Sequence, residues 1–214
     1  MTGSRRTYDS TLRSERASQT RSQVFDAAAE TFSEFGWAGA TVAQIASRAG
    51  VSVDTVTTTG SKGLLLLEAF RRRYTGEDGW ASILELERTR VLFSIEDPTE
   101  ALDALVDFLW NAHGASARLW LLLRTVALTE TVVAEGMADL HRLKTESFVE
   151  TTRWLQRLGI VAEVADEHLG QLAAEVNLVM SAETYLQLVD DYGWTEEAYG
   201  AWIRRSLLAL GRRS

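Results

Sequence analysis

A glycine corner between two short helical segments is the feature that most constrains this fold. Apolar residues recur at helical spacing through 42–49, and this run ends at Gly50-Val51-Ser52, after which a second segment opens at Val53. Gly50 tolerates the positive φ that ends a helix, and Val51 can plug the angle between two helices. Two short helices joined by such a turn form a helix-turn-helix, whose second helix can lie in the major groove of DNA. The stretch therefore predicts a helical, DNA-binding head.

Hydroxyl residues stand where these helices should begin. Thr41 suits the N-cap of the first helix and Ser52 that of the second, because a hydroxyl oxygen accepts from a free backbone N–H group. A third helix start follows at Ser61 and Lys62. Backbone N–H groups at a helix start, with a lysine beside them, can hold a phosphate. Lys62 is therefore a candidate phosphate ligand.

The remaining sequence also favours an all-α fold. It has one proline, Pro98, among 214 residues, and no stretch of useful length alternates between apolar and polar residues as a strand would. Zero cysteines exclude disulfides, thiolate metal sites and cysteine nucleophiles. No apolar run approaches the length that spans a bilayer, and the chain opens without an apolar signal segment. A cytoplasmic protein is therefore expected.

Charge divides the chain into a mildly basic head and an acidic body. The net charge is −8, yet residues 1–75 hold ten basic and seven acidic side chains, and the remainder holds 12 basic and 23 acidic ones. A basic head on an acidic body fits a protein whose head meets phosphate. Residues 1–20, polar and rich in Ser, Thr and Arg, predict a flexible basic arm. This arm is either a disordered terminus or adds phosphate or minor-groove contacts through Arg5 and Arg6, before a helix begins near Arg21.

Two pieces of sequence carry a family resemblance: AAAETFSEFGWAGATVAQIASRAGVS and the glycine-serine-lysine start of the following helix. With these motifs, residues 21–75 resemble the helix-turn-helix head of a TetR-family transcriptional regulator. The resemblance implies an all-helical protein with a short DNA-binding domain at 21–75 and a variable ligand-binding and dimerisation domain at 76–214. It also implies a homodimeric repressor that leaves a palindromic DNA operator when a small apolar or aromatic molecule binds.

The recognition segment departs from the family pattern. The run from Val56 to Lys62 is one residue shorter than is common, and the aromatic residue, most often Tyr, that would follow Val56 is missing. Either the phosphate-contacting aromatic is absent or the sequence lacks a residue of the native chain. One missing residue rotates Thr57 to Thr59 by about 100° around the helix, and threonines are poor helix formers. An alternative is therefore a helical ligand-binding dimer that has lost specific DNA binding.

The expected DNA contacts come from the two short helices and the start of the next. Thr41 and Lys62 should hold phosphates, while the second helix faces base edges or nearby phosphates. Asp54 would repel phosphate, so it either accepts from a cytosine amino group or points away. The expected DNA-binding residues are Thr41, Ser52, Asp54, Thr55, Thr57, Thr58 and Lys62.

Helical periodicity continues through the body. The expected helices are 79–94, 98–113, 115–130, 132–158, 164–191 and 194–212. The last two look like the family's dimerisation unit, in which two helices from each protomer pack as a four-helix bundle; alternatively they only close the core of the monomer. The expected dimer contacts are Leu169, Leu172, Val176, Met180, Trp202 and Leu207.

A ligand pocket is expected among the other helices of the body, since ligand sites in helical bundles are largely apolar with few polar groups. The candidate lining residues are Trp80, Phe108, Trp110 and Trp120, which serve equally well as core. The candidate polar anchors are His141 and Asn177, and Asn111 and His113 are two further candidates. The sequence does not name the effector, the operator or the regulated genes.

Enzymatic motifs do not emerge. His113, His141 and His168 lack metal-ligand spacing, and Asp166-Glu167-His168 is too local to form a metal-binding helix face. No strand precedes a glycine-rich phosphate loop, and no Ser/His/Asp set follows from spacing. A protein without catalysis, cofactor or metal is expected, with repression or activation of transcription left open.

Overall fold

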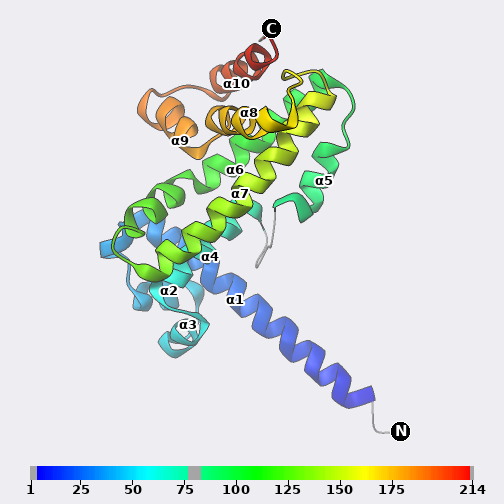
Figure 1. Ribbon diagram of the computed structural model, residues 1–214. Coiled ribbons are helices and arrows are strands. Elements are labelled where there is room, and N and C mark those ends of the chain that lie inside the picture. Colours follow the sequence, from blue (N-terminus) through cyan, green and yellow to red (C-terminus); the bar gives the residue numbers. More distant parts are fainter. Residues whose placement is uncertain (1–3, 77–82, 213–214) are drawn as a thin grey trace.

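The computed structural model describes residues 4–76 and 83–212, with side chains from Arg16 onward. Every regular element in these ranges is helical, as the sequence predicts (Figure 1). The first elements are α1 Ser4–Gly39, α2 Val42–Ala49, α3 Val53–Thr59 and α4 Lys62–Thr75. They are followed by a 3-10 turn at Ile83–Glu85, α5 Glu87–Phe93, α6 Pro98–Val126, α7 Thr131–Arg157, α8 Asp166–Val179, α9 Ala182–Tyr185, a π-helical turn at Leu186–Asp191 and α10 Glu196–Leu210. None of these described helices is long and apolar enough to cross a membrane.

Helix α1 is longer than the sequence indicates. Its backbone is helical from Ser4, so residues 4–20 of the predicted basic arm are helical, and they contain neither glycine nor proline to stop a helix. In Figure 1 this part of α1 extends away from the rest of the molecule. At the other end Gly36, with a φ of 64°, interrupts α1. The side chains of Arg5 and Arg6 lie outside the described ones.

Apolar faces of α1, α2, α3 and α4 meet in the core of the head. Val24 and Phe32 of α1, Ile45 of α2, Val56 of α3 and Leu65 of α4 are all at most 1% exposed. Full burial of such side chains contributes roughly 1.5–3 kcal/mol each. Short helices such as α2 and α3 are marginal alone, so this shared core is what holds them in place.

Helix α4 connects the head to the body. It packs against α1 on one side and against α6 and α7 on the other. Helix α7 comes close at Gly136, where a Cβ atom would lie 2.4 Å from Leu67 Cδ1. Further along α4, Phe70 packs against Trp120 of α6 with ring centroids 5.4 Å apart. Head and body therefore share α4 as a common structural element.

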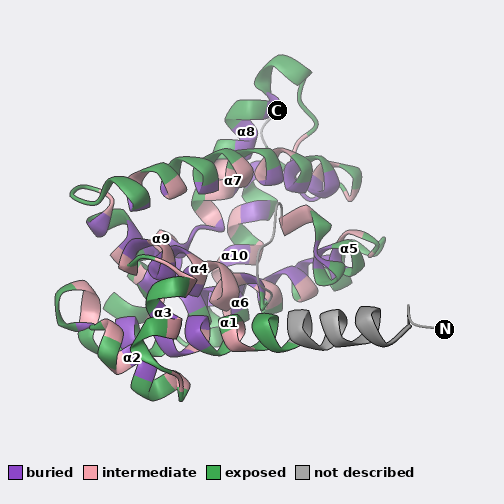
Figure 2. Ribbon diagram, turned by 90° about the horizontal axis from the view of Figure 1, so that it is seen from below, coloured by how far each residue is buried: buried purple, intermediate pink, exposed green. Residues whose placement is uncertain are grey.

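The long helices α6 and α7 carry most of the body. Figure 2 shows the buried positions of α7 as patches on one side of its ribbon, with exposed positions on the other. Helix α8 packs on α7, and α10 packs on α6 and α8. This arrangement is the helical packing that the 3.6-residue periodicity predicts.

One predicted helix boundary in the body is wrong. The sequence predicts separate helices at 98–113 and 115–130, but α6 runs unbroken through Gly114. A Cβ atom on Gly114 would lie 3.3 Å from the Tyr185 hydroxyl. Gly114 therefore gives room to a neighbouring helix, and the surrounding contacts outweigh the modest cost of a glycine inside a helix.

A second boundary is also wrong, because the predicted helix 164–191 is interrupted. Helix α8 ends at Val179, and the Ser181 side chain accepts from the Thr184 backbone N–H at 3.1 Å to begin α9. The backbone carbonyl of Met180 is thereby available to a partner outside its own helix, because the helix does not continue past it. The partner is His113 of α6, at 2.9 Å.

Candidate DNA-binding head and ligand cavity

The two short helices of the head are capped as the sequence predicts. Thr41 forms a capping box with Gln44: its hydroxyl accepts from the Gln44 N–H at 3.2 Å, and its own N–H donates to Gln44 Oε1 at 2.7 Å. Gly50 has a φ of 68° and ends α2. Ser52 then caps α3 by accepting from the Thr55 N–H at 3.0 Å. The glycine corner therefore fixes the angle between α2 and α3 through local contacts.

Helix α3 buries one residue and exposes most of the others. Val56 is 0% exposed and anchors the helix to the head. Val53, Asp54, Thr57 and Thr58 are exposed, and so form a threonine-lined outer face. The Thr57 hydroxyl donates to the backbone carbonyl oxygens of Val53 and Asp54 at 3.1 and 3.0 Å. Its lone pairs and its methyl group therefore stay available for base edges.

Lys62 has a structural partner at the start of α4. Its ammonium group donates to the backbone carbonyl oxygen of Trp37 at 2.5 Å and lies 4.6 Å from the centroid of the Trp37 ring. Beside it, Ser61 caps α4 by accepting from the Leu64 N–H at 3.3 Å. A lysine has three N–H donors, so this contact leaves two for a phosphate at the same helix start.

Most described arginines of the head are paired with its own acids. The carboxylates of Asp26, Glu30, Glu34 and Glu68 pair with four of them, at N–O distances of 2.5–3.8 Å: Arg48, Arg71, Arg72 and Arg73. Among the described side chains, Arg16 and Arg21 of α1 form no ion pair with a carboxylate and are exposed. The surplus positive charge of the head therefore lies on α1 and at Lys62.

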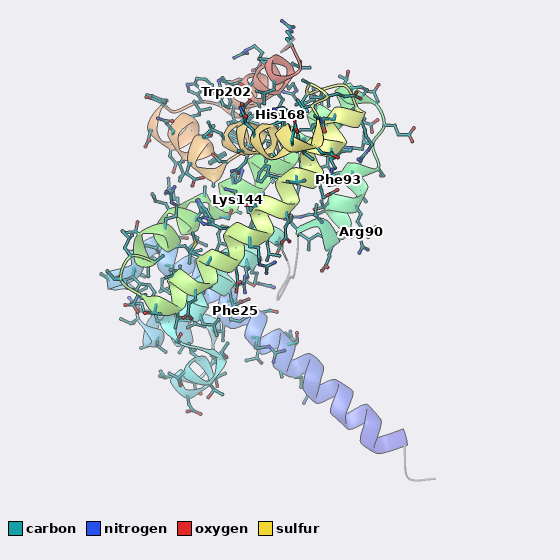
Figure 3. All side chains as sticks on the ribbon, in the orientation of Figure 1. Phe25, Arg90, Phe93, Lys144, His168 and Trp202 are labelled. Atoms are coloured by element: carbon teal, nitrogen blue, oxygen red, sulfur yellow. The ribbon has the colours of Figure 1, made fainter. Side chains whose placement is uncertain are left out.

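A largely apolar cavity lies in the body between α4, α5, α6, α7 and the break that follows α8. The centre of a water-sized sphere can occupy about 90 Å³ of it, and the space of about 900 Å³ between its atoms includes open solvent at its mouth. Six large side chains dominate its wall: Phe70, Phe93, Phe108, Trp120, Phe148 and Met180. Figure 3 labels Phe93 at the end of α5 and Lys144 midway along α7. The cavity has the apolar, aromatic lining that is typical of small-molecule sites.

His113 gives this cavity a buried hydrogen-bond acceptor. It is 4% exposed and lines the cavity. Its Nε2 lies 2.9 Å from the Met180 carbonyl oxygen, and because a carbonyl can only accept, Nε2 carries the proton. Burial lowers the pKa of His113 to about 4, so the ring is neutral at pH 7. Its Nδ1 is therefore an unprotonated acceptor, and it has no partner among the described residues.

Lys144 gives the cavity a cation. Its ammonium group lies 5.0 Å from the Trp120 ring centroid and 5.9 Å from that of Phe148. Burial lowers the pKa of Lys144 from its ordinary value, and the charge of Glu183 opposes that shift. No carboxylate among the described residues lies within ion-pair distance of this ammonium group.

Glu183, the acid beside Lys144, is bound to other donors. Its Oε1 accepts from Trp120 Nε1 at 2.8 Å and from Arg124 Nη1 at 2.7 Å. Burial alone would raise the pKa of Glu183, but the Trp120 hydrogen bond and the charges of Lys144 and Arg124 bring it below its usual value. The carboxylate is therefore ionised at neutral pH and contributes one negative charge beside two positive ones.

The predicted dimer contacts lie mostly in the core of the protomer. Five of the six are buried, at 0–6% exposed: Leu169, Leu172, Val176, Met180 and Leu207. Helix α8 packs against α7 and α10, and α10 packs against α6, so contacts inside the protomer already cover these five side chains. Their role in a dimer stays a prediction. Trp202 is half-buried. On the outer face of the same helices, Leu178 is 69% and Leu208 41% exposed.

A family match covers the head. Residues 24–58, from the middle of α1 to the end of α3, match the bacterial regulatory proteins of the tetR family. The head therefore carries a TetR-family DNA-binding domain. A search of curated proteins found no match. The crystal structure of a linker-substituted HlyIIR mutant protein is similar, with a TM-score of 0.58, 16% identity, and coverage of 92% of this chain and 98% of that chain. At that identity the likeness shows a shared fold.

The family matched by the head is one of bacterial regulatory proteins, so a regulatory, DNA-binding role is indicated for this part of the chain. No group of three side chains able to hold a metal occurs in the part of the chain that the structure describes. The match spans the expected contacts from Thr41 to Thr58, while Lys62 follows it. These residues belong to α3, to the first residue of α4 and to the N-caps of α2 and α3, and α2 and α3 lie side by side (Figure 1).

The predicted pocket residues of the chain scatter over several places. Phe108 and Trp120 line the cavity. His141 and Asn177 line a neighbouring groove that shares Trp120 and Lys144 with it. Trp110 packs instead on Tyr185 and Tyr199, Asn111 is exposed, and Trp80 lies outside the described residues.

Sequence reasoning missed two kinds of cavity residue. Phe70 and Tyr74 belong to α4, which the sequence assigns to the head, so only the packing of head on body reveals them. Lys144 could have been found from its own helix. Leu140 and Phe148 stand four residues to either side of it, and a lysine between apolar residues at that spacing faces inward.

Proposed function

We propose that this protein is a homodimeric TetR-family repressor that a small effector releases from a palindromic operator. The observation that supports it best is the course of α4. Its first residue, Lys62, touches the head at Trp37, and Phe70 and Tyr74 at its other end line the cavity. A single helix therefore carries contacts with both the DNA-binding unit and the space where an effector fits.

The mechanism follows from this shared helix. An effector that fills the cavity presses on Phe70 and Tyr74 and displaces α4. Helix α3 follows, because the corner between them is tight: a Cβ atom on Gly60 would lie 2.6 Å from Leu64 Cδ2. Two recognition helices of a dimer must match major grooves roughly 34–36 Å apart. A small rotation of each head breaks that match, so the effector shifts the population toward the released state.

The DNA contacts divide by exposure. We assign Thr41 and Lys62 to phosphates, and Thr57 and Thr58 to base edges or nearby phosphates, since these residues lie at or near the outer surface. Asp54 is also exposed, and we assign it to a cytosine amino group. Ser52 and Thr55 bond each other through their hydroxyls at 2.8 Å. They therefore act first on the shape of α3 and only second on DNA.

For the dimer, we propose the outer face of α8 and α10, with Leu178 and Leu208 in place of the five buried leucine, valine and methionine positions. Exposed apolar side chains on two adjacent helices are what a four-helix interface buries. The functional division into 21–75 for DNA and 76–214 for ligand and dimer remains, although α4 packs against both parts.

The test is binding to the DNA that flanks the gene for this chain, measured by gel shift at moderate salt. A repressor gives discrete, sequence-specific retardation at a palindrome. A helix α3 of seven residues that no longer reads DNA gives only salt-labile smearing, the result expected of a ligand-binding dimer that has lost specificity. Reporter transcription with and without the bound operator separates repression from activation.

A further inference from the structure

We propose that the cavity takes an amphipathic monoanion: an apolar ring-bearing body with one carboxylate-type group, held at Lys144, and one hydroxyl or N–H donor, held at His113. This inference rests on the proposed function only in naming the cavity as the effector site. It assigns a chemical class to the effector from the groups that line the cavity.

The first step is the balance of charge around Lys144. The charges that act on its ammonium group are those of Glu183 and Arg124. Glu183 is committed to Arg124 and Trp120 by two hydrogen bonds through Oε1. Two cations therefore share one carboxylate, which leaves one positive charge in excess at a wall built of aromatic rings. A ligand with a single negative charge neutralises that excess, and in this weakly polar setting a charged hydrogen bond is strong.

The second step is the buried acceptor. Nδ1 of His113 is unprotonated, because Nε2 donates to the Met180 carbonyl oxygen. It has no donor among the described residues although the ring is 4% exposed. A second cavity atom, Thr89 Oγ1, is likewise buried and unpartnered. Buried polar atoms are normally hydrogen-bonded. Nδ1 of His113 therefore calls for a ligand with a polar hydrogen to donate, whereas the Thr89 hydroxyl can either accept from a ligand or donate to it.

The two anchors belong to one site. His113 and Lys144 line the same cavity, and the charge of Lys144 acts on the His113 ring. Trp120 and Phe148 line the same cavity, and aromatic side chains suit a planar apolar body. A cationic ligand would meet Lys144 and Arg124 as like charges. A ligand without a hydrogen-bond donor would shield His113 Nδ1 from water and leave it without a hydrogen bond.

The experiment uses the full chain without DNA and three matched probes: 6-hydroxy-2-naphthoate, 2-naphthoate and 6-hydroxy-2-naphthamide. Isothermal titration calorimetry gives each dissociation constant. We expect the hydroxy acid to bind tightest, with a loss of about tenfold when the carboxylate becomes an amide and a similar loss when the hydroxyl is removed. Equal or tighter binding of the amide overturns the charge assignment, and an unchanged affinity without the hydroxyl overturns the donor assignment.

The protein variants localise the effect. Lys144→Met keeps length and apolar contact but removes the charge, so it should weaken both acids by about tenfold and leave the amide unchanged. Arg142→Gln is the matched control, because Arg142 is an exposed cation on the same helix, paired with Glu146 at 3.2 Å. If Lys144→Met affects acid and amide alike, or if neither acid binds saturably at millimolar concentration, the proposal is wrong.

Failure of this inference is distinguishable from failure of the proposed function. The calorimetry reports the chemistry of the cavity alone, whereas a gel shift with the same probes reports release from DNA. Acid-selective binding that leaves DNA retention unchanged refutes the regulatory mechanism and upholds the ligand class. Release from DNA by the amide and not by the acids upholds the regulatory mechanism and refutes the ligand class.

Discussion

Lys62 Nζ donates a 2.5 Å hydrogen bond to the backbone carbonyl oxygen of Trp37 and lies over the indole ring of the same residue. The pair joins the end of α1 to the first residue of α4. A side chain expected only to hold phosphate therefore also sets where α4 starts relative to the helix-turn-helix. Substitutions there act on both the stability of the head and the binding of DNA.

Replacing Lys62 with Ala should weaken DNA binding by a similar factor for every sequence. The loss of one phosphate contact should also reduce the slope of log affinity against log salt by about 1. The lost hydrogen bond and cation–π contact should lower the free energy of unfolding by about 1 kcal/mol. Fluorescence anisotropy over a salt series measures the first effect and urea unfolding the second. Arg90→Ala, which removes an exposed cation on α5, is the control. A K62A protein with wild-type affinity and slope would refute the phosphate role.

Replacing Thr57 with Val should reduce specificity more than general affinity. Thr57 is exposed on α3 and its hydroxyl oxygen keeps its lone pairs free, so removal of this acceptor should cost roughly 1–3 kcal/mol against the operator and little against random DNA. Thr125→Val is a matched control, since Thr125 is also exposed in a helix and donates to the carbonyl four residues earlier, that of Leu121, at 3.0 Å. Competition anisotropy gives the ratio of operator to random affinity. An unchanged ratio in T57V would place this side chain outside the base-reading surface.

The protein should become less stable as pH falls, because of His113. The folded-state pKa is about 4 and the ordinary value is 6.5. Between those values the unfolded chain binds the proton and the folded protein does not, so stability is lost as pH falls from 6.5 to 4, by up to about 3 kcal/mol. His113→Gln can still donate to the Met180 carbonyl but does not titrate. Urea unfolding at pH 7 and pH 4.5 should therefore show a smaller loss for H113Q; since the carboxylates are common to both proteins, equal losses would contradict the assignment.

Replacing Leu178 with Arg should weaken the dimer without unfolding the protomer. The side chain is 69% exposed on α8, so a charge there is solvated in the monomer and buried only in the interface. Sedimentation velocity over a concentration series measures the shift toward monomer. Leu128→Arg, at a residue 83% exposed beyond the end of α6, is the control. A dimer as tight in L178R as in the wild type would exclude this face.

By contrast Leu172→Ala should cost about 2–5 kcal/mol of folding stability, because that leucine belongs to the core of the protomer.

The features predicted correctly from sequence are those set by neighbours along the chain. Caps at Thr41 and Ser52 and the left-handed Gly50 depend on a few adjacent residues, so their signals are local. The all-α class likewise follows from periodicity and the scarcity of breakers. These local contacts hold the helix-turn-helix together in the structure.

The features that sequence reasoning placed wrongly or left open depend on distant partners. An apolar stripe containing Leu172 says that one face is buried but not whether α10 of the same chain or a second chain buries it. From the sequence, a glycine inside a helix such as Gly114 looks the same as a glycine that ends one. The Tyr185 hydroxyl packed against Gly114 gives the reason for a glycine within the continuous α6. The cavity needs α4, α6 and α7 in place at once, so Phe70 and Lys144 become neighbours only after folding.

The continuity of α6 has a mechanical consequence. Near one end Asp103 forms an ion pair with Arg204 of α10 at 2.7 Å, and toward the other end Trp120 touches Phe70 of α4. Because α6 is one continuous helix, a tilt imposed on its middle moves both of its ends together. Helix α6 thus couples the position of α10 to that of α4. A flexible linker inserted at Gly114 would uncouple the two.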